Sequence, residues 1–431
     1  MLILRDFYLS QLIKKRANGL VKIITGIRRC GKSFFLFKLF YDYLLQDGVP
    51  RENIITLALD QAVNAKYRNP LLLDAYVREK VSDGGRKFYV FLDEIQQVLS
   101  IPNPYLDHPD AKIGFVDVLL GLMELPNVDI YVTGSNSRML SSDIVTEFRD
   151  RGDEVRLHPL SFHEFYSHYS GDKRHAWRDY YTYGGLPRLT TLATHVEKSQ
   201  YLQGLFANIY LKDIMERHRI LNEKSVLDDL LNVIASSIGS LSNPTRIANT
   251  FKSEKGQVVA ANTLSIYLDY FIDAFLLAKA SRYDIKGRRL INSPVKYYFE
   301  DVGLRNALLD FRQQEVNHIM ENVIYNELRR RGFNVNVGIV PYNYKNEHGQ
   351  SALAQLEIDF VADKAGDRFY IQSALNIDDS AKREQETRPL RRIEDSFKKI
   401  IVMNSEIVPW SDEYGIKYVG IEDFLLHEHV N

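Results

Sequence analysis

The chain has 431 residues, of which 45% are hydrophobic and 12% aromatic, with 55 Lys and Arg against 56 Asp and Glu. At about 100–200 residues per domain, this length predicts two to four domains. The balanced charge excludes a polybasic protein of the histone kind, and the composition excludes wholesale disorder. The single cysteine excludes an intramolecular disulfide framework.

The sequence predicts no membrane-spanning helix, because no stretch supplies 18 consecutive apolar residues. The N-terminus interrupts its apolar run at Arg5 and Asp6 and has no small-residue cleavage site. We therefore expect a cytoplasmic protein without a membrane partner.

The first 190 residues alternate strand and helix patterns. Short β-branched or aromatic runs, candidate strands separated by helical patterns, lie at 21–25, 53–58, 87–93, 128–133 and 154–157. Near-continuous apolar strands separated by helices imply a parallel sheet that is covered on both faces. The sequence thus predicts a doubly wound α/β domain.

A phosphate-binding loop is predicted between a strand that ends at Thr25 and a helix that begins near Lys32, where GIRRCGKS fits the pattern GxxxxGK[ST]. Glycines at both ends let successive backbone N–H groups curl around phosphate oxygens. Lys32 would supply a charge to the β- and γ-phosphates of ATP, and the Ser33 hydroxyl would bind Mg²⁺. The predicted nucleotide-binding residues are Gly26, Ile27, Arg28, Arg29, Cys30, Gly31, Lys32 and Ser33.

Two carboxylates, Asp93 and Glu94, follow the buried strand 88–93. Asp93 would hold Mg²⁺ through water, and Glu94 would polarise the attacking water. A carboxylate beside the aspartate indicates hydrolysis rather than phosphate transfer to a metabolite. The strand at 53–58 lies between the two motifs, so the acidic strand is not the next strand after the phosphate loop.

Two further candidates flank later strands. Ser135 or Asn136, after the fourth strand, could reach the γ-phosphate and the attacking water, or could simply cap a loop or helix. Arg151 precedes the fifth strand, where a cation could reach the γ-phosphate of a neighbouring subunit as an arginine finger. The alternative for Arg151 is a solvated surface arginine.

Together these motifs resemble a large bacterial and archaeal family of AAA+ ATPases whose C-terminal domain of unknown function is related to restriction endonucleases. The resemblance rests on TGIRRCGKS, FLDEIQ, YVTGSNSRML, HPLSFHEF and YGGLPRL, and continues through IYLKDIMERHRI, PVKYYFEDVGLRNALL and ENVIYNELRRRG. It implies an AAA+ module, a winged-helix module and a nuclease-like module in that order. We therefore expect domains at 1–195, 196–292 and 293–431.

The resemblance also implies roles for single residues. It supports nucleotide and Mg²⁺ binding at the loop and acidic pair, and implies a sensor at Ser135 or Asn136. Arg151 falls where the family usually has Gly-Arg, although Asp150 precedes it here; as a finger it would imply a homo-oligomer. The stretch 185–187 resembles a Gly-Leu-Pro motif that related signalling ATPases place against the adenine. Pro187 is thus a candidate nucleotide contact or part of a rigid interdomain turn.

The middle of the chain predicts helices at 225–238, 244–251 and 261–278, which is helix-turn-helix order. The basic stretch that follows would form a hairpin wing able to touch DNA phosphates. The third helix carries Asp269 and Asp273, however, so packing or a protein partner is an equally open interpretation. The basic residues of the wing are Arg282, Lys286, Arg288 and Arg289.

The tail predicts a helix at 318–331 and strands at 333–340, 356–362 and 369–374. A restriction-endonuclease-like site needs two acids that hold Mg²⁺ and a nearby lysine. The residues that bear on this site are Glu321 or Glu327 and Asp359 as acids, Gln372 in place of the second strand acid, Ala374 in place of the lysine, and Lys382 or Glu384 as substitutes. We expect a degenerate nuclease fold that is kept for binding.

The sequence therefore predicts a Mg²⁺-dependent ATPase in which hydrolysis or nucleotide exchange reorients the C-terminal domains. Three outputs stay open: a DNA-associated motor or switch, a signalling or defence switch that acts through protein partners, and an ATP-dependent nuclease.

Overall fold

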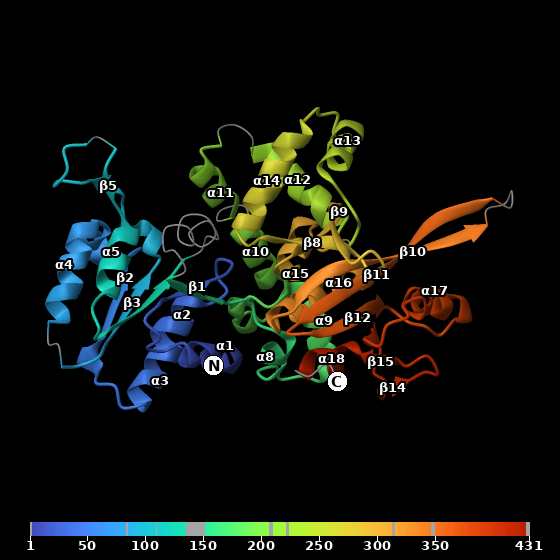
Figure 1. Ribbon diagram of the computed structural model, residues 1–431, viewed down its shortest axis with the longest axis horizontal. Helices are drawn as coiled ribbons and strands as arrows, with labels where there is room; N and C mark the ends of the chain where they lie inside the picture. Colours follow the sequence, from blue (N-terminus) through green and yellow to red (C-terminus); the bar gives the residue numbers. More distant parts are fainter. Residues whose placement is uncertain are drawn as a thin grey trace. The chain divides into compact units, whose positions relative to one another are not determined.

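The computed structural model describes residues 2–82, 85–108, 110–134, 151–206, 210–220, 224–312, 315–345 and 350–427. The chain forms two compact units. Unit 1 comprises Met1–Pro159 with Asp273–Phe275, and unit 2 comprises Leu160–Ile272 and Leu276–Asn431. Unit 1 has the blue-to-teal colours of Figure 1, and unit 2 the green-to-red colours. Within the described ranges, every helix is too short or too polar to span a bilayer.

A five-stranded parallel sheet forms the centre of unit 1, as the sequence predicts. Its strand order is β2-β3-β6-β1-β7, so β6 lies between the strand that precedes the phosphate loop and the strand that ends in the acidic pair. Because the strands are parallel, their carboxyl ends share one edge, where ligands of open α/β sheets bind. The strands are β1 (Val21–Thr25), β2 (Ile54–Ala58), β3 (Phe88–Asp93), β6 (Val128–Thr133) and β7 (Gly152–Arg156).

Helices surround this sheet (Figure 1). The segment after the phosphate loop packs through Phe40, whose ring lies 4.8 Å from Tyr131 and 5.7 Å from Phe91 between centroids. Aromatic packing of this kind anchors the loop's helix to the strands. The elements are α1 (Asp6–Lys14), α2 (Lys32–Phe34), η1 (Phe35–Phe40), α3 (Tyr41–Gln46), η2 (Arg51–Asn53), η3 (Ala62–Arg68), α4 (Pro70–Lys80), η4 (Ile95–Gln97), the short pair β4 (Ile101–Pro102) and β5 (Lys112–Ile113), and α5 (Phe115–Met123).

The helices of unit 2 from α8 to α14 precede the first strand of its sheet in the chain. Helices α8, α9 and α10 lie in unit 2, where α8 packs on α9, and α9 and α10 pack on α15 (Val302–Leu308). Strand β9 runs across the predicted boundary at 292/293, and the three-domain division stays a prediction. The elements are α8 (Phe162–Tyr166), α9 (Lys173–Tyr183), η5 (Pro187–Thr191), α10 (His195–Leu205), α11 (Leu211–His218), α12 (Lys224–Ser236), α13 (Pro244–Glu254) and α14 (Ala261–Asp273).

A hairpin of β8 (Leu277–Asp284) and β9 (Arg289–Phe299) follows α14. The third predicted helix therefore ends at Asp273 and not at 278, because Leu277 and Ala278 pair with β9 instead. The hairpin does not stand alone, since β8 also pairs in parallel with β10 (Asn334–Lys345). The predicted wing is thus the edge of a larger sheet.

That sheet has eight strands in the order β14-β15-β13-β12-β11-β10-β8-β9. Helix α16 leads into the antiparallel meander β10-β11-β12, and α17 connects β12 to β13, which pairs parallel to it. The far halves of β10 and β11 extend as an arm, in orange in Figure 1. The remaining elements are α15 (Val302–Leu308), α16 (Val316–Arg330), β11 (Ser351–Lys364), β12 (Asp367–Ala374), α17 (Ser380–Arg391), β13 (Lys398–Met403), β14 (Trp410–Ser411), β15 (Ile416–Gly420) and α18 (Ile421–Leu426).

A buried ion pair between Lys22 on β1 and Asp129 on β6 joins two central strands of unit 1. The exposed fractions of their side chains are 0% and 3%. Asp129 also accepts hydrogen bonds from the Tyr131 hydroxyl at 2.8 Å and the Ala17 N–H at 2.9 Å. A buried charge is tolerated when its partner and hydrogen bonds are present, and is strongly destabilising when they are removed.

We predict that Asp129→Asn destabilises unit 1 by about 3–5 kcal/mol, because it leaves the Lys22 ammonium buried without a counter-charge. Hydrogen exchange of peptides that cover β1 and β6 measures the change. The control is Asp42→Asn, which removes an exposed pair with Lys38 and should change stability by less than about 0.5 kcal/mol. Equal protection in the two variants would contradict a stabilising role of the buried pair.

Candidate functional site

The phosphate loop curls tightly at the carboxyl end of β1. Gly26 has a φ of +135°, and a Cβ on it would lie 2.0 Å from the Leu157 carbonyl oxygen, so only glycine fits. Gly31, with φ of +100°, accepts the Phe35 N–H at 2.8 Å as the helix begins. The buried Lys32 ammonium donates to the carbonyls of Gly26 at 2.9 Å and of residue 27 at 3.1 Å. The Lys32 ammonium therefore lies against the backbone of the phosphate loop itself.

The acidic pair lies at the end of β3, tied to the end of β6 through Thr133. The Thr133 hydroxyl donates to the Asp93 carboxylate and accepts the Glu94 N–H at 3.0 Å. Burial raises the pKa of Asp93, and hydrogen bonds from Thr133 and Ser33 oppose this shift only in part. The structure thus brings Ser33 of the phosphate loop close to Asp93. A Mg²⁺ site shared by the two stays a prediction. Gln96 donates to the Glu94 carboxylate.

Arg5 is a further residue of this region that sequence reasoning did not assign. Only 4% of it is exposed, and its guanidinium donates to the carbonyl oxygens of Cys30 at 3.3 Å and His158 at 2.7 Å. Cys30 is buried, with its thiol donating to the Leu157 carbonyl at 3.3 Å. Arg5 therefore connects the phosphate loop to the chain just after β7. The only trace of this role in the sequence is a charge inside an apolar run.

The two flanking candidates differ in what the structure says of them. The Arg151 side chain is 51% exposed and lies 3.8 Å from the exposed Glu124 carboxylate. Such an exposed pair contributes little to stability. About half of the Arg151 side chain, just before β7, is open to solvent. Ser135 and Asn136 lie outside the described residues, and the sensor stays a prediction.

Comparison with known proteins bears on the whole chain. Residues 18–166 match the family model described as an AAA domain, and residues 174–315 match a domain of unknown function (DUF8612). An uncharacterized protein of Haemophilus influenzae is 32% identical over 431 residues, which is 99% of each chain. The chain belongs to the AAA+ ATPase family. The predicted resemblance is thereby confirmed.

Two more distant relatives extend the likeness of this AAA+ protein. An uncharacterized protein of Methanocaldococcus jannaschii is 27% identical over 421 residues, covering 94% of this chain and 85% of that one. The structure of a Walker-type ATPase from Pyrococcus abyssi has a TM-score of 0.50 at 16% identity, covering 72% of this chain and 96% of that one. This last likeness shows a shared fold.

The Gly-Leu-Pro turn of this AAA+ protein lies in unit 2. A Cβ on Gly184 would lie 2.0 Å from Asp301 Oδ1, and one on Gly185 would lie 2.2 Å from the Leu160 carbonyl oxygen. Asp301 Oδ2 accepts the Gly185 N–H at 2.7 Å, and burial raises the pKa of Asp301 to about 6. Packing against Asp301, at the start of α15, therefore accounts for Gly184, and the close approach of the Leu160 carbonyl accounts for Gly185. The contact of Pro187 with a nucleotide stays a prediction.

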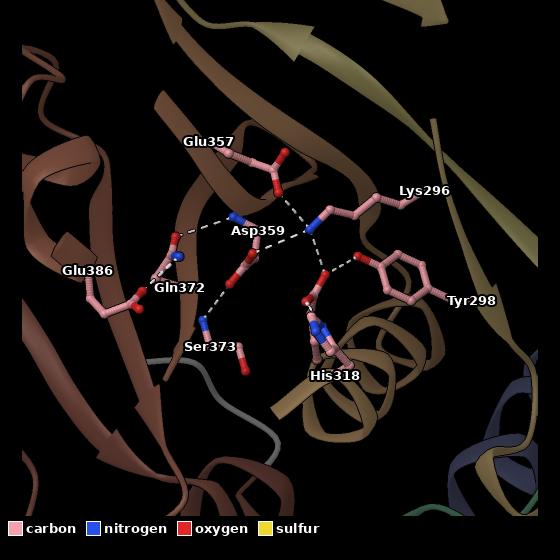
Figure 2. A network of polar contacts seen from close by, with 9 residues as sticks. Lys296, Tyr298, His318, Glu357, Asp359, Gln372, Ser373 and Glu386 are labelled. Atoms are coloured by element: carbon pink, nitrogen blue, oxygen red, sulfur yellow. Dashed lines mark hydrogen bonds and ion pairs between the residues drawn. The ribbon is translucent and has the colours of Figure 1, made fainter. Parts of the chain in front are cut away.

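Unit 2 contains a buried ionic cluster that consists of Lys296, Tyr298, Glu321, Glu357 and Asp359. The Lys296 ammonium, from β9, lies 2.7 Å from Glu321, 2.8 Å from Glu357 and 3.5 Å from Asp359 (Figure 2). Tyr298 donates to Glu321 at 2.6 Å. Of the two candidate helix acids, the structure thus brings Glu321 together with Asp359, around a lysine that sequence reasoning did not assign.

The other predicted tail residues lie apart from the centre of this ionic cluster. Glu327 pairs instead with Arg330 at 2.7 Å and Arg331 at 2.6 Å. Glu384 pairs with Arg391 at 2.8 Å. Gln372 accepts the Asp359 N–H at 3.3 Å and donates to Glu386 at 2.9 Å. Lys382 is exposed and lies 3.5 Å from Asn376.

We predict that Thr133→Val destabilises unit 1 by about 1–3 kcal/mol, because it leaves the buried Asp93 carboxylate and the Glu94 N–H without their shared partner. Thermal unfolding of the nucleotide-free protein measures the change. Thr133→Ser keeps the hydroxyl and should stay close to wild type; a loss as large as that of the valine variant would show that the hydroxyl does not account for the stability of this site.

Proposed function

We propose that this chain hydrolyses ATP with Mg²⁺ and that its nucleotide state changes the arrangement of the winged-helix and nuclease-like parts of unit 2. One observation carries the proposal: the hydrogen bonds that connect Asp93, Thr133 and Glu94 at the carboxyl edge of the parallel sheet. Ligands of open α/β sheets bind at this edge. A chain of this family with these residues has the parts that hydrolysis needs.

The residues at this edge fit Mg²⁺. Oxygen ligands suit the ion, and the Ser33 hydroxyl lies near enough to the Asp93 carboxylate to oppose the rise in its pKa. These two side chains would hold it, Asp93 through water. When bound, Mg²⁺ neutralises charge on the β- and γ-phosphates. A cation beside Asp93 also offsets the burial that raises its pKa.

The protein's own groups would perform the remaining steps. Lys32 would exchange its contacts with loop carbonyls for phosphate oxygens. Glu94 would accept a proton from the water whose oxygen attacks the γ-phosphorus while the bond to ADP breaks. The left-handed backbone of Glu94, with φ of +51°, and the contact with Gln96 fix where its carboxylate points.

For unit 2 we propose binding rather than cutting. The order α16-β10-β11-β12-α17-β13 supports a nuclease-like fold, and α12-α13-α14 followed by the β8–β9 hairpin supports a winged helix. Lys286 and Arg288 are exposed at the hairpin turn, where phosphates of duplex DNA could reach them. A protein partner is the second candidate, supported by the acidic residues Asp269 and Asp273 on α14.

We expect Lys32→Ala to lose ATP binding, and Glu94→Gln to keep binding but lose about 10²–10⁴-fold in turnover, because the base is removed while the phosphate contacts remain. Phosphate release and binding of a fluorescent ATP analogue measure the two effects. Glu79→Gln, an exposed carboxylate on α4, is the control and should behave as wild type. Unchanged turnover in Glu94→Gln would remove Glu94 from the reaction.

The same assay with duplex DNA separates the two outputs. Salt-sensitive stimulation that disappears in Lys286→Ala/Arg288→Ala favours the DNA-associated switch. Turnover that DNA does not change favours a protein partner.

We also propose that Arg151 acts on the nucleotide of a neighbouring subunit in a homo-oligomer. Arg151→Ala should then lower turnover by about 10³-fold or more, since arginine fingers contribute 10³–10⁵. A mixture of Arg151→Ala with Lys32→Ala should be more active than either variant alone, because the second supplies the missing arginine. Arg51→Ala, on the surface of unit 1, is the control. Full activity of Arg151→Ala at every protein concentration would contradict this role.

A further inference from the structure

The nuclease-like fold that we propose for unit 2 implies a divalent metal between the helix acid Glu321 and the strand acid Asp359. The structure places a different cation there. The Lys296 ammonium, 2% exposed, lies within 2.7–3.5 Å of oxygens of Glu321, Glu357 and Asp359 (Figure 2). An ammonium has three N–H donors, so these three carboxylates match its capacity.

Oxygens of the two buried acids also have partners other than Lys296. Glu321 Oε1 accepts the Tyr298 hydroxyl at 2.6 Å, and Asp359 Oδ2 accepts the Ser373 N–H at 2.8 Å. Glu321 Oε2 lies 3.8 Å from His318 Nδ1. Across the described part of the chain, no group of three or more His, Cys, Asp and Glu is arranged to hold a metal ion. The donor set therefore fits an ammonium and not a divalent ion.

Electrostatics of the cluster agree with this geometry. Burial opposes the charge of Lys296, but Glu321, Asp359 and Glu357 together raise its pKa above the usual value, so it stays protonated. Burial and the nearby Glu321 raise the pKa of Asp359. A site prepared for Mg²⁺ needs ionised carboxylates free to approach to about 2.0–2.1 Å, which these contacts prevent.

We propose that the Lys296 ammonium takes the place of the divalent metal in the nuclease-like fold of unit 2, so that this centre is metal-free and does not cut nucleic acid. The inference rests on the proposed nuclease-like fold. A lysine that activates water would have to lie beside a metal, whereas Nζ of Lys296 lies where the carboxylate oxygens converge. Gln372 and Ala374, at the positions of the strand acid and lysine, accord with a centre without metal chemistry.

The test asks whether removal of the ammonium opens a metal site. The full chain carries Asp93→Asn throughout, so that the nucleotide site contributes no metal, and bound Mn²⁺ is measured by electron paramagnetic resonance without nucleotide. We expect no Mn²⁺ at the cluster of this parent, and about one Mn²⁺ per chain in Lys296→Met. Adding Asp359→Asn to Lys296→Met should abolish it. Lys296→Arg and Lys279→Met, an exposed lysine on β8, should bind none.

A second variant covers the case in which Lys296→Met does not fold, because it leaves buried carboxylates unpaired. Lys296→Met/Glu357→Gln removes the partly exposed acid and keeps Glu321 and Asp359. Its unfolding temperature should rise with Mn²⁺ concentration, while that of Lys296→Arg should not, since only a ligand of the folded state stabilises it.

Two results would overturn the proposal. The first is Mn²⁺ that the parent binds and that is lost when Asp359→Asn is added. The second is that Lys296→Met and Lys296→Met/Glu357→Gln fold but gain no Mn²⁺. Mn²⁺-dependent nicking of DNA by the parent, abolished by Asp359→Asn, would in addition establish the nuclease alternative. Phosphate release tests the proposed ATPase separately from this proposal, because it needs neither Lys296 nor Mn²⁺ bound in unit 2. Failure of DNA binding by unit 2 leaves the Mn²⁺ results unaffected.

Discussion

The hydroxyl of Thr133 connects the ends of two neighbouring parallel strands, and the arrangement of the nucleotide site depends on it. It fixes the Asp93 carboxylate and the backbone of Glu94 at one point on the edge of the sheet. The strand order places β6 between β1 and β3, so the residue that ends β6 lies between the phosphate loop and the acidic pair. Parallel pairing thus determines which side chains of distant sequence positions can cooperate.

The phosphate loop and the acidic pair could be predicted from the sequence because each is a short local pattern between a strand and a helix or turn. Arg5 and Lys296 could not, because their partners are distant in the chain. Arg5 contacts a carbonyl 153 residues away, and Lys296 contacts a carboxylate 63 residues away. Only the pairing of strands brings such groups together, and a single sequence does not encode that pairing in any local motif.

Element boundaries were less predictable than element types. The sequence predicts helices at 225–238, 244–251 and 261–278, and the structure has them at 224–236, 244–254 and 261–273. The end of the third depends on strand pairing that begins at Leu277. The hairpin after it was expected as a separate wing and instead forms the edge of the eight-stranded sheet. In the tail, the sequence shows Ala374 where the family resemblance leads us to expect a lysine. It does not show that Lys296, on an earlier strand, lies beside Asp359.

Strand β9 belongs both to the exposed turn and to the interior of unit 2. Its first residue, Arg289, is exposed beside the basic turn, and Lys296 on the same strand is buried among carboxylates. At about 3.3 Å per residue, roughly 23 Å of continuous strand separates the two. The pairing of β9 with β8 changes register between Ile291 and Lys296, so the two ends of the strand belong to separate stretches of pairing. The contacts of Lys296 with the three carboxylates therefore involve no residue of the basic turn.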